Sequence, residues 1–389
     1  MHIVLSTDQV MWDVFTHLKS DLAEHLTPEI LKLSSIRTVR DFEWSFRWSS
    51  PYRIKAQAQV VSWLKRYRFE NDVFTDSELE DRTVSKFLAD QQRIAMLKPL
   101  THRSYLVVQG ARKIIRKVLG EAPSLQQIYE LGQFSRNATV GYSGEEVYID
   151  RKFSPGECIL SGTAPELKDY LKEVLDDPLM SKILSGLPYE STFHAPFVSV
   201  ASSLKQVNVP KTAVIMRPVR PNTLVGSFLS DGVGKWITES IRENLGVNLN
   251  HLQRVHQRLA QFGSRRMHNA TADLSAASDS FVSWLLNMLL PRSWFRLLQR
   301  WRVPQIEIEG RKNYSPSFIA MGIGYTFPLM SLCFHSLLLS LQDLAGIKGR
   351  ISVFGDDLIY PRRLPPYVEI LFSDLNFLLN KDKTFHDIP

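Results

Sequence analysis

Two adjacent aspartates lie between two short apolar segments near the end of the chain, in the stretch RISVFGDDLIYP at residues 350–361. Gly355 comes directly before Asp356 and Asp357, and a glycine-containing turn between two apolar runs predicts a β-hairpin. Acidic residues at a hairpin turn are common and by themselves carry no function. A tight turn nevertheless lets two neighbouring carboxylates project beyond the edge of a sheet. The segment therefore predicts an antiparallel sheet with two negative charges at one end.

A second acidic segment precedes this hairpin. Small and β-prone residues lead to Asp273, and residues 281–290 have the apolar pattern of a buried helix. Asp273 is therefore expected at the end of a strand and Asp279 near the start of a helix, where aspartate also serves as a cap. Placed beside Asp356 and Asp357, Asp273 would complete an oxygen-rich site for Mg²⁺. Two such ions can activate a 3′-hydroxyl and stabilise a pyrophosphate leaving group.

Between the two acidic segments, Gly322 and Gly324 precede a long apolar stretch. Glycines allow a backbone to approach a ligand closely, although a simple loop leading into a helix explains them as well. The most apolar part, residues 327–341, is interrupted by serines and is shorter than the ~20 residues that cross a bilayer. We therefore predict a buried helix.

Basic residues are concentrated before the first acidic segment. The whole chain has a net charge of +7, with 47 basic and 40 acidic residues. Residues 210–266 contain nine basic and three acidic residues, or +6. The basic ones are Lys211, Arg217, Arg220, Lys235, Arg242, Arg254, Arg258, Arg265 and Arg266. A solvated face is the simplest interpretation, but the neighbouring carboxylates favour a role in binding polyphosphate.

Composition excludes several classes of protein. The chain of 389 residues is long enough for two or three structural units, and its hydrophobic content of 44% is typical of globular proteins. The only cysteines, Cys158 and Cys333, exclude a disulfide-rich scaffold and a cysteine zinc site. The first residues lack the basic start of a signal peptide, so we expect a soluble, intracellular protein. We further expect helices over most of residues 10–130, loops and short strands at 131–155, and a helix at 167–184.

The order of these motifs resembles the palm of viral RNA-dependent RNA polymerases, in which Asp-x5-Asp precedes a glycine loop with its helix and then Gly-Asp-Asp. The strings themselves are similar to the replicase β-subunit of RNA bacteriophages, the leviviruses. They are DLSAASDS at 273–280, GYTF at 324–327, QRLAQFGS at 257–264, VPKT at 209–212, Arg217-Pro218 and KTF at 383–385. The resemblance covers at least residues 209–389 and extends weakly to 137–141, whereas the first ~120 residues carry no recognisable signature.

The chain departs from the family pattern at three places. Ile323 stands between the loop glycines where the family usually has Asn, and Val214 stands where a second lysine is common. Residues 222–223 are Asn-Thr, where Glu-Pro is usual. The family also continues well beyond Lys-Thr-Phe, whereas this sequence ends at Pro389. We therefore expect a divergent member with an incomplete reading frame.

The resemblance implies an α+β right-hand polymerase with fingers and palm, in which helices flank an antiparallel palm sheet and the thumb is missing or truncated. It places the N-terminal region and fingers in residues 1–258, with a basic segment at 209–266 through which nucleotides would enter. The catalytic palm would occupy residues 259–389, with a fingers insertion at about 292–320.

The implied activity is RNA-templated RNA synthesis by two Mg²⁺ ions, with Mn²⁺ as a possible substitute, replicating a positive-strand phage genome. Asp273 and Asp356 would be the principal metal ligands, Asp357 an ancillary one, and Asp279 would contact the ribose 2′-hydroxyl. Lys211 and Arg217 would hold the triphosphate. Lys383 would either protonate the departing pyrophosphate or be an exposed loop lysine. The full set of nucleotide-binding candidates is Lys211, Arg217, Arg220, Asp279, Gly322, Gly324 and Thr326.

Two other functions stay open. Reverse transcriptases share this arrangement. Their turn usually reads aromatic-x-Asp-Asp, and the glycine at the x position, Gly355, argues against that class. A non-catalytic RNA-binding fragment is disfavoured because all three aspartates are present. The resemblance also implies RNA template and product, nucleoside triphosphates and the host elongation factors Tu and Ts as partners, no membrane, and the cytoplasm of an infected bacterium.

Overall fold

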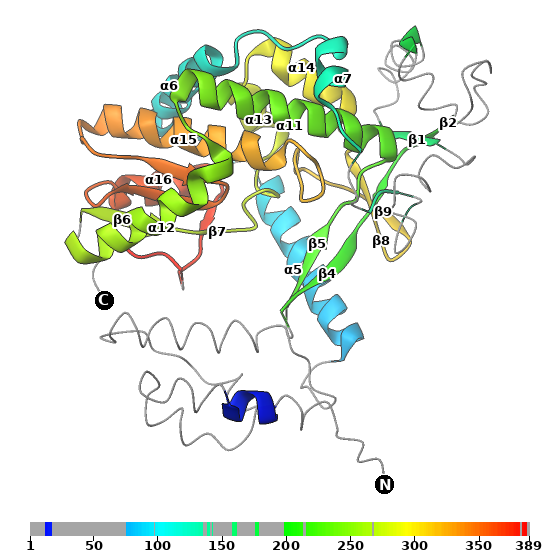
Figure 1. Cartoon of the computed structure of the whole chain (residues 1–389), viewed down its shortest axis with the longest axis horizontal. Coiled ribbons are helices and arrows are strands. Elements are labelled where there is room, and N and C mark those ends of the chain that lie inside the picture. Colours follow the sequence, from blue (N-terminus) through cyan, green and yellow to red (C-terminus); the bar gives the residue numbers. More distant parts are fainter. Residues whose placement is uncertain are drawn as a thin grey trace. The chain divides into compact units, whose positions relative to one another are not determined.

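The computed structural model separates the chain into two compact units (Figure 1). It describes residues 12–17, 75–96, 98–134, 138–140, 142, 158–161, 176–178, 198–212, 215–266, 268–381 and 383–386. The first unit comprises Met1–Ser85, Asn208–Arg217 and Pro389, and the second comprises Lys86–Val207 and Pro218–Ile388. The boundary predicted between residues 258 and 259 falls inside helix α12 (Leu249–Arg266), and the division into fingers and palm stays a prediction.

The described residues of the first unit lie almost entirely in helices and strands. Helix α5 (Asp76–Ala95) begins in this unit and continues into the second. Thr75 caps it, because the Thr75 hydroxyl accepts from the Glu78 N–H at 3.2 Å while Glu78 Oε2 accepts from the Thr75 N–H at 2.7 Å. Strands β4 (Val207–Thr212) and β5 (Ile215–Val219) form a two-stranded sheet.

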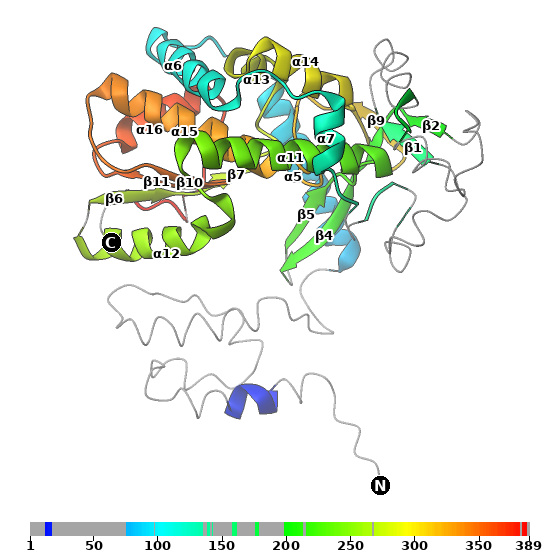
Figure 2. The same cartoon turned by 45° about the horizontal axis from the view of Figure 1, so that its top comes forward.

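The second unit is built around helix α15 (Thr326–Ala345), whose buried side chains face several neighbours. It contacts α6 (His102–Leu119), α11 (Leu224–Leu245) and α16 (Pro365–Asp374) (Figure 2). Among the described residues, α15 is the one helix long and apolar enough to cross a membrane, but 72% of that window is buried inside the protein. The predicted buried helix is confirmed.

Shorter helices complete this core. Helix α13 (Ser283–Leu289) contacts α6 and is followed by α14 (Arg292–Trp301). Helix α7 (Leu125–Leu131) contacts α11 and begins with a capping box between Ser124 and Gln127. The described parts of residues 10–130 are thus largely helical, as predicted. Most of the predicted loop at 131–155 and of the predicted helix at 167–184 lies outside the described residues.

The acidic segments lie on an antiparallel sheet of three strands, in the order β10 (Ser352–Phe354), β11 (Asp357–Pro361) and β6 (Asn269–Ala272). Helix α12 packs against all three strands and α15 packs against β10; Figure 2 shows α12 below the sheet and α15 above it. His256 on α12 contacts the Ser352 hydroxyl through Nε2 at 2.9 Å. Burial lowers the pKa of His256 to about 4, so this contact is made by a neutral ring near pH 7. The predicted antiparallel sheet flanked by helices is present.

The described part of the second unit contains three further sheets. Strand β7 (Leu274–Ser275) pairs with β12 (Leu378–Leu379) in antiparallel fashion. Strands β3 (Leu204–Lys205), β8 (Gln305–Ile308) and β9 (Arg311–Tyr314) form a mixed sheet, and β1 (Cys158–Ser161) pairs with β2 (Val198–Ala201) in parallel. Strand β7 begins directly after Asp273, so the pairing of β7 with β12 helps to position Asp273.

Candidate active site

The Gly-Asp-Asp segment forms the turn of the β10–β11 hairpin. Phe354 pairs with Asp357, which leaves Gly355 and Asp356 as a two-residue loop. Gly355 has a φ of 64°, and glycine at the first loop position is typical of the turns that join tightly twisted strands. Its N–H donates to the Ser331 hydroxyl on α15 at 2.9 Å. The core helix therefore anchors the turn that carries Asp356.

We predict that Gly355→Ala destabilises the protein more than Gly346→Ala does. Both glycines have a φ of 64°, so both substitutions impose the same backbone strain. A Cβ at Gly355 would lie 2.8 Å from Phe327 Cε2, whereas nothing lies within 4 Å of one at Gly346. Phe327 is 38% exposed and its ring can shift, so overpacking should add about 1 kcal/mol, the low end of its usual range, to the loss of unfolding free energy in Gly355→Ala. Denaturant unfolding measures the difference, and equal losses would contradict the packing argument.

The strand register brings Asp273 next to the hairpin turn. Leu358 pairs with Ala272, so Asp357 and Asp273 are the next opposed positions at that end of the β11–β6 ladder. Opposed residues of antiparallel strands have Cα atoms ~4.5–5.5 Å apart and side chains on the same face. The predicted adjacency of the strands bearing Asp273 and the Gly-Asp-Asp turn is confirmed.

Asp357 interacts electrostatically with the carboxylates of both Asp356 and Asp273. Burial raises the pKa of Asp357, the carboxylates of Asp356 and Asp273 raise it further, and the Lys383 ammonium opposes the rise. A bound cation would relieve this repulsion. Within the described ranges, no group of three His, Cys, Asp or Glu side chains is close enough to hold a metal ion by itself. Mg²⁺ commonly takes one or two carboxylates and completes its shell with waters and substrate phosphates, so these hard oxygen donors suit it.

On its other side, Asp273 is held by the segment that follows β12. The Asn380 side-chain amide donates to Asp273 Oδ2 at 2.9 Å, and the Asn380 backbone N–H donates to the Asp273 carbonyl, also at 2.9 Å. Lys383 Nζ lies 3.3 Å from the same Oδ2, with its side chain 57% exposed. Lys383 therefore reaches the predicted site. Asn380 was not among the predicted site residues, although its position three residues before the Lys-Thr-Phe string was a signal.

Asp279 and Arg220 form a buried ion pair. Arg220 Nη2 lies 2.7 Å from Asp279 Oδ1, and the two side chains are 7% and 12% exposed. Burial raises the pKa of Asp279, and the Arg220 guanidinium opposes that rise. The nucleotide-binding role predicted for Arg220 would place it facing Asp273, Asp356 and Asp357. Instead it lines a cavity of about 20 Å³, room for about one water, whose lining does not include those aspartates.

A ring of buried hydrogen bonds supports this ion pair. Arg220 Nη1 donates to the Ser315 hydroxyl, which donates to Gln91 Oε1 at 2.7 Å. Gln91 Nε2 donates to the Ser317 hydroxyl, which donates to the Asp279 carbonyl at 2.6 Å. Because a buried guanidinium needs a carboxylate and further hydrogen bonds to offset its desolvation, the ring explains why Arg220 turns inwards. Sequence reasoning gave no signal for Gln91, which lies on α5.

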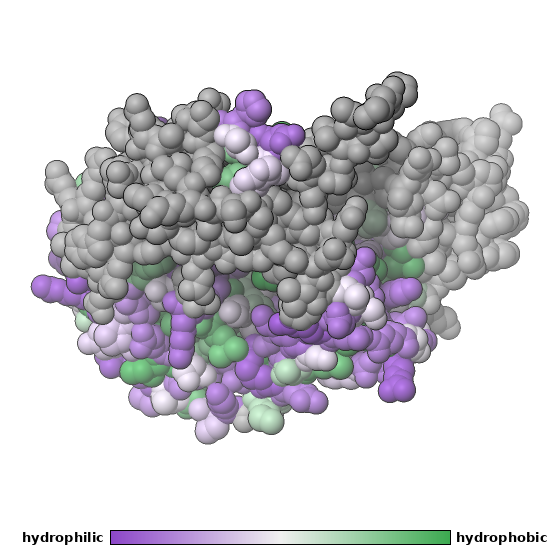
Figure 3. Space-filling model, turned by 90° about the horizontal axis from the view of Figure 1, so that it is seen from below, coloured by the Kyte–Doolittle hydropathy of each residue, from purple (hydrophilic) through white to green (hydrophobic). Residues whose placement is uncertain are grey.

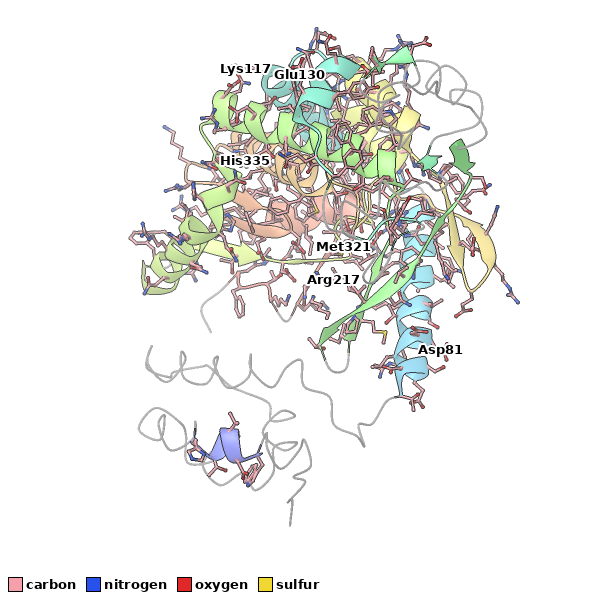
Figure 4. The ribbon with its side chains drawn as sticks, turned by 45° about the vertical axis from the view of Figure 1, so that its right-hand side comes forward. Asp81, Lys117, Glu130, Arg217, Met321 and His335 are labelled. Atoms are coloured by element: carbon pink, nitrogen blue, oxygen red, sulfur yellow. The ribbon has the colours of Figure 1, made fainter. Side chains whose placement is uncertain are left out.

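The two loop glycines are required by close packing of one backbone on another. Gly322 has a φ of 104°, and a Cβ there would lie 2.3 Å from the Arg220 carbonyl oxygen. A Cβ at Gly324 would lie 2.7 Å from the Asp231 nitrogen. The Thr326 hydroxyl donates to the Ala320 carbonyl at 2.8 Å and is buried. Figure 4 labels Met321 in this loop, which leads into α15. These contacts favour the interpretation that the glycines belong to a simple loop leading into a helix. The nucleotide contacts predicted for Gly322, Gly324 and Thr326 stay predictions.

Lys211 and Arg217 belong to the first unit, on β4 and β5. Lys211 is exposed and Arg217 is partly buried, so their predicted contact with a triphosphate stays a prediction. In the second unit, the exposed face of α12 carries Arg254 and Arg258, and this helix contains no acidic residue. In Figure 3, hydrophilic side chains cover much of the described surface, with hydrophobic ones between them.

The fold is similar to a crystal structure of the RNA-dependent RNA polymerase of a human picobirnavirus, with a TM-score of 0.52 and 12% identity. The match covers 98% of this chain and 67% of that one. The fold is therefore that of a viral RNA-dependent RNA polymerase. The model of the family "RNA replicase, beta-chain" matches residues 65–389, so this chain belongs to that family. The predicted relationship to phage replicases is confirmed, and the match begins well before the motifs that predicted it.

Curated relatives include three phage proteins. The RNA-directed RNA polymerase subunit beta of Escherichia virus Qbeta is 30% identical over 285 residues, covering 72% of this chain and 45% of the relative. The beta chain of Escherichia phage MS2 is 30% identical over 273 residues, covering 70% and 48%. That of Enterobacteria phage GA is 36% identical over 178 residues, covering 46% and 33%. The chain thus spans less than half the length of these relatives.

Proposed function

We propose that this chain carries the nucleotidyl-transfer centre of an RNA-directed RNA polymerase that replicates the genome of an RNA phage. The supporting observation is the strand register that opposes Asp273 to Asp357 at the Gly-Asp-Asp turn. The reaction joins the 3′-hydroxyl oxygen of an RNA chain to the α-phosphorus of a nucleoside triphosphate and releases pyrophosphate. Family membership supports the substrates named here, template RNA and nucleoside triphosphates.

Asp273 and Asp356 would hold Mg²⁺, or Mn²⁺ in its place, with Asp357 as an ancillary ligand. When bound, two such ions would stabilise charge on the attacking and leaving oxygens. Lys383 lies against Asp273 and would donate a proton to the departing pyrophosphate. Its exposed side chain is long and flexible, so it can move from the carboxylate towards a substrate.

Asp279 would contact the ribose 2′-hydroxyl and so favour ribonucleotides over deoxyribonucleotides. Arg220 would act indirectly, by keeping the Asp279 carboxylate charged and in place through the 2.7 Å ion pair. Host elongation factors Tu and Ts are proposed as further partners, in the cytoplasm of an infected bacterium. That proposal follows from the phage replicase family alone.

The triphosphate-binding role is tested by Lys211→Ala and Arg217→Ala. We expect each to raise the nucleotide KM about tenfold or more, because a hydrogen bond to a charged group contributes roughly 1.5–3 kcal/mol. Lys205→Ala is the control, since Lys205 is an exposed lysine on the strand β3. Steady-state incorporation kinetics provide the measurement. Wild-type KM and kcat in both variants would mean that the basic segment is a solvated face.

Primer extension tests the proposed function as a whole. The assay compares ribonucleotides with deoxyribonucleotides on an RNA template, with Mg²⁺ and with EDTA, for this chain and for a chain extended to the length of its relatives. Metal-dependent incorporation of ribonucleotides alone would support the proposal. Incorporation of deoxyribonucleotides would favour a reverse-transcriptase-like enzyme. Binding of RNA without incorporation by either chain would favour a non-catalytic RNA-binding protein.

A further inference from the structure

We infer that Asn380 is a positioning residue that fixes the carboxylate of Asp273 for cation binding. The inference rests on the proposed function, because it takes Asp273 to be a metal ligand. It concerns a residue outside the motifs that predicted the site, and it depends on contacts that only the folded chain creates.

The β7–β12 register places Asn380 opposite Asp273. Leu378 pairs with Ser275 and Leu379 pairs with Leu274, so the next opposed positions are Asn380 and Asp273. The Asn380 backbone N–H donates to the Asp273 carbonyl at 2.9 Å, which continues the ladder by one bond. Opposed side chains in an antiparallel pair lie on the same face. Asn380 is therefore held where its side chain meets the Asp273 carboxylate, at 2.9 Å from Oδ2.

Asp273 thus lies between two sheets and has a different neighbour from each. On the β11 side it is opposed to Asp357, whose negative charge repels it. On the β12 side it is opposed to Asn380, which donates a hydrogen bond. A donor on one oxygen fixes the rotation of the carboxylate about its last bond. Without that donor, repulsion from Asp357 would favour rotation of Asp273 away from the site.

A neutral amide suits this task better than the neighbouring lysine. The Lys383 ammonium carries a positive charge, which would compete with a cation for the same carboxylate. The Asn380 amide carries no net charge and can stay bound to Asp273 while a cation occupies the site. The Asn380 carbonyl also accepts the Lys383 backbone N–H at 3.1 Å, which forms the turn that brings Lys383 back to Asp273.

Mn²⁺ binding to the full chain tests the inference without requiring polymerisation. Electron paramagnetic resonance measures the concentration of free Mn²⁺ while each protein is titrated with Mn²⁺. The proteins compared are the wild type and the variants Asp273→Asn, Asn380→Ala, Asn380→Ser and Asn244→Ala. Asn244 is the matched control, because its amide donates to the Val118 carbonyl at 2.9 Å, outside the site. Loss of a hydrogen bond to a metal ligand typically costs about 10–100-fold in metal affinity, and we expect that loss in Asn380→Ala. Asn244→Ala should bind Mn²⁺ like the wild type.

Incorporation kinetics supply a second readout. In Asn380→Ala, kcat should fall and should partly recover at high Mg²⁺, while the KM for nucleotide stays unchanged. A merely structural role would lower the fraction of active protein without changing the Mg²⁺ dependence. If Asn380→Ala fails to fold, as judged by thermal unfolding, Asn380→Ser provides the same comparison with a side chain too short to reach Oδ2.

The outcomes separate this inference from the proposed function. Loss of Mn²⁺ binding in Asp273→Asn together with weakened binding in the Asn380 variants supports both. Loss in Asp273→Asn with wild-type binding and wild-type Mg²⁺ dependence in the Asn380 variants overturns the positioning role alone. Wild-type binding in Asp273→Asn, or no binding in the wild type, overturns the metal role of Asp273 and this inference with it.

Discussion

Asp356→Asn in the full-length enzyme is expected to reduce kcat for ribonucleotide incorporation by roughly 10²–10³-fold, the loss typical when a group that stabilises transition-state charge is removed. The substitution is nearly isosteric, and the turn is held by the backbone of Gly355, so the hairpin should survive. It removes one negative charge from the proposed site, and a neutral amide is a poorer ligand for a hard cation. The loss should therefore appear in kcat.

Template RNA binding should be almost unchanged in Asp356→Asn, because it depends on basic residues and counterion release. The measurement pairs incorporation at saturating template with template binding at a fixed salt concentration. Asp343→Asn is the control, since Asp343 is an exposed aspartate near the end of α15. If Asp356→Asn retained more than about a tenth of wild-type kcat, a barrier change under ~1.4 kcal/mol, Asp356 would not be a principal ligand.

Arg220→Ala should destabilise the protein by about 3–5 kcal/mol, the typical cost of leaving one member of a buried ion pair without its partner. The pair is nearly inaccessible to solvent, with side chains 7% and 12% exposed. Denaturant unfolding measures the loss. Arg242→Ala is the control, because Arg242 pairs with Glu239 and these side chains are 55% and 49% exposed. Solvent screens an exposed pair, which therefore contributes little, so the control should lose little stability.

The stability deficit of Arg220→Ala should also depend on pH. Burial already raises the pKa of Asp279 above its ordinary 3.8, and removing the guanidinium raises it further. A carboxyl with a raised folded-state pKa destabilises the fold when ionised, and protonation relieves that penalty. The deficit relative to the wild type should therefore be largest at neutral pH and shrink as the pH falls through the raised pKa of Asp279. A deficit that does not change with pH would mean that lost packing, rather than the unpaired carboxylate, causes it.

Local sequence patterns determined the parts of this protein that local forces build. The glycine and flanking apolar residues of the Gly-Asp-Asp segment predicted the β10–β11 hairpin, because a two-residue turn and two short strands are specified within one stretch of chain. The all-round apolar pattern of residues 327–341 predicted a buried helix, observed as α15. The ordered motifs predicted the family, which the match of the family model to residues 65–389 confirmed.

Tertiary structure alone decided which of these residues meet. Arg220 looked like one more member of a basic run, yet it is buried against Asp279, because desolvating a guanidinium is tolerable only beside a carboxylate. Gln91, far away in the sequence, completes the hydrogen-bond ring around that pair. Gly322 looked like a ligand-binding glycine, yet the Arg220 carbonyl occupies the space of its missing Cβ.

At the candidate site, the contact between Asn380 and Asp273 could not be predicted from the local sequence either. This contact depends on the register of the two-residue pairing between β7 and β12, and a shift of one residue would turn the Asn380 side chain to the opposite face. So short a strand carries no periodic signal, and its partner lies more than a hundred residues earlier in the chain. The sequence specified the chemical groups of the site, whereas long-range strand pairing and burial decided their neighbours, because both depend on packing that no local segment contains.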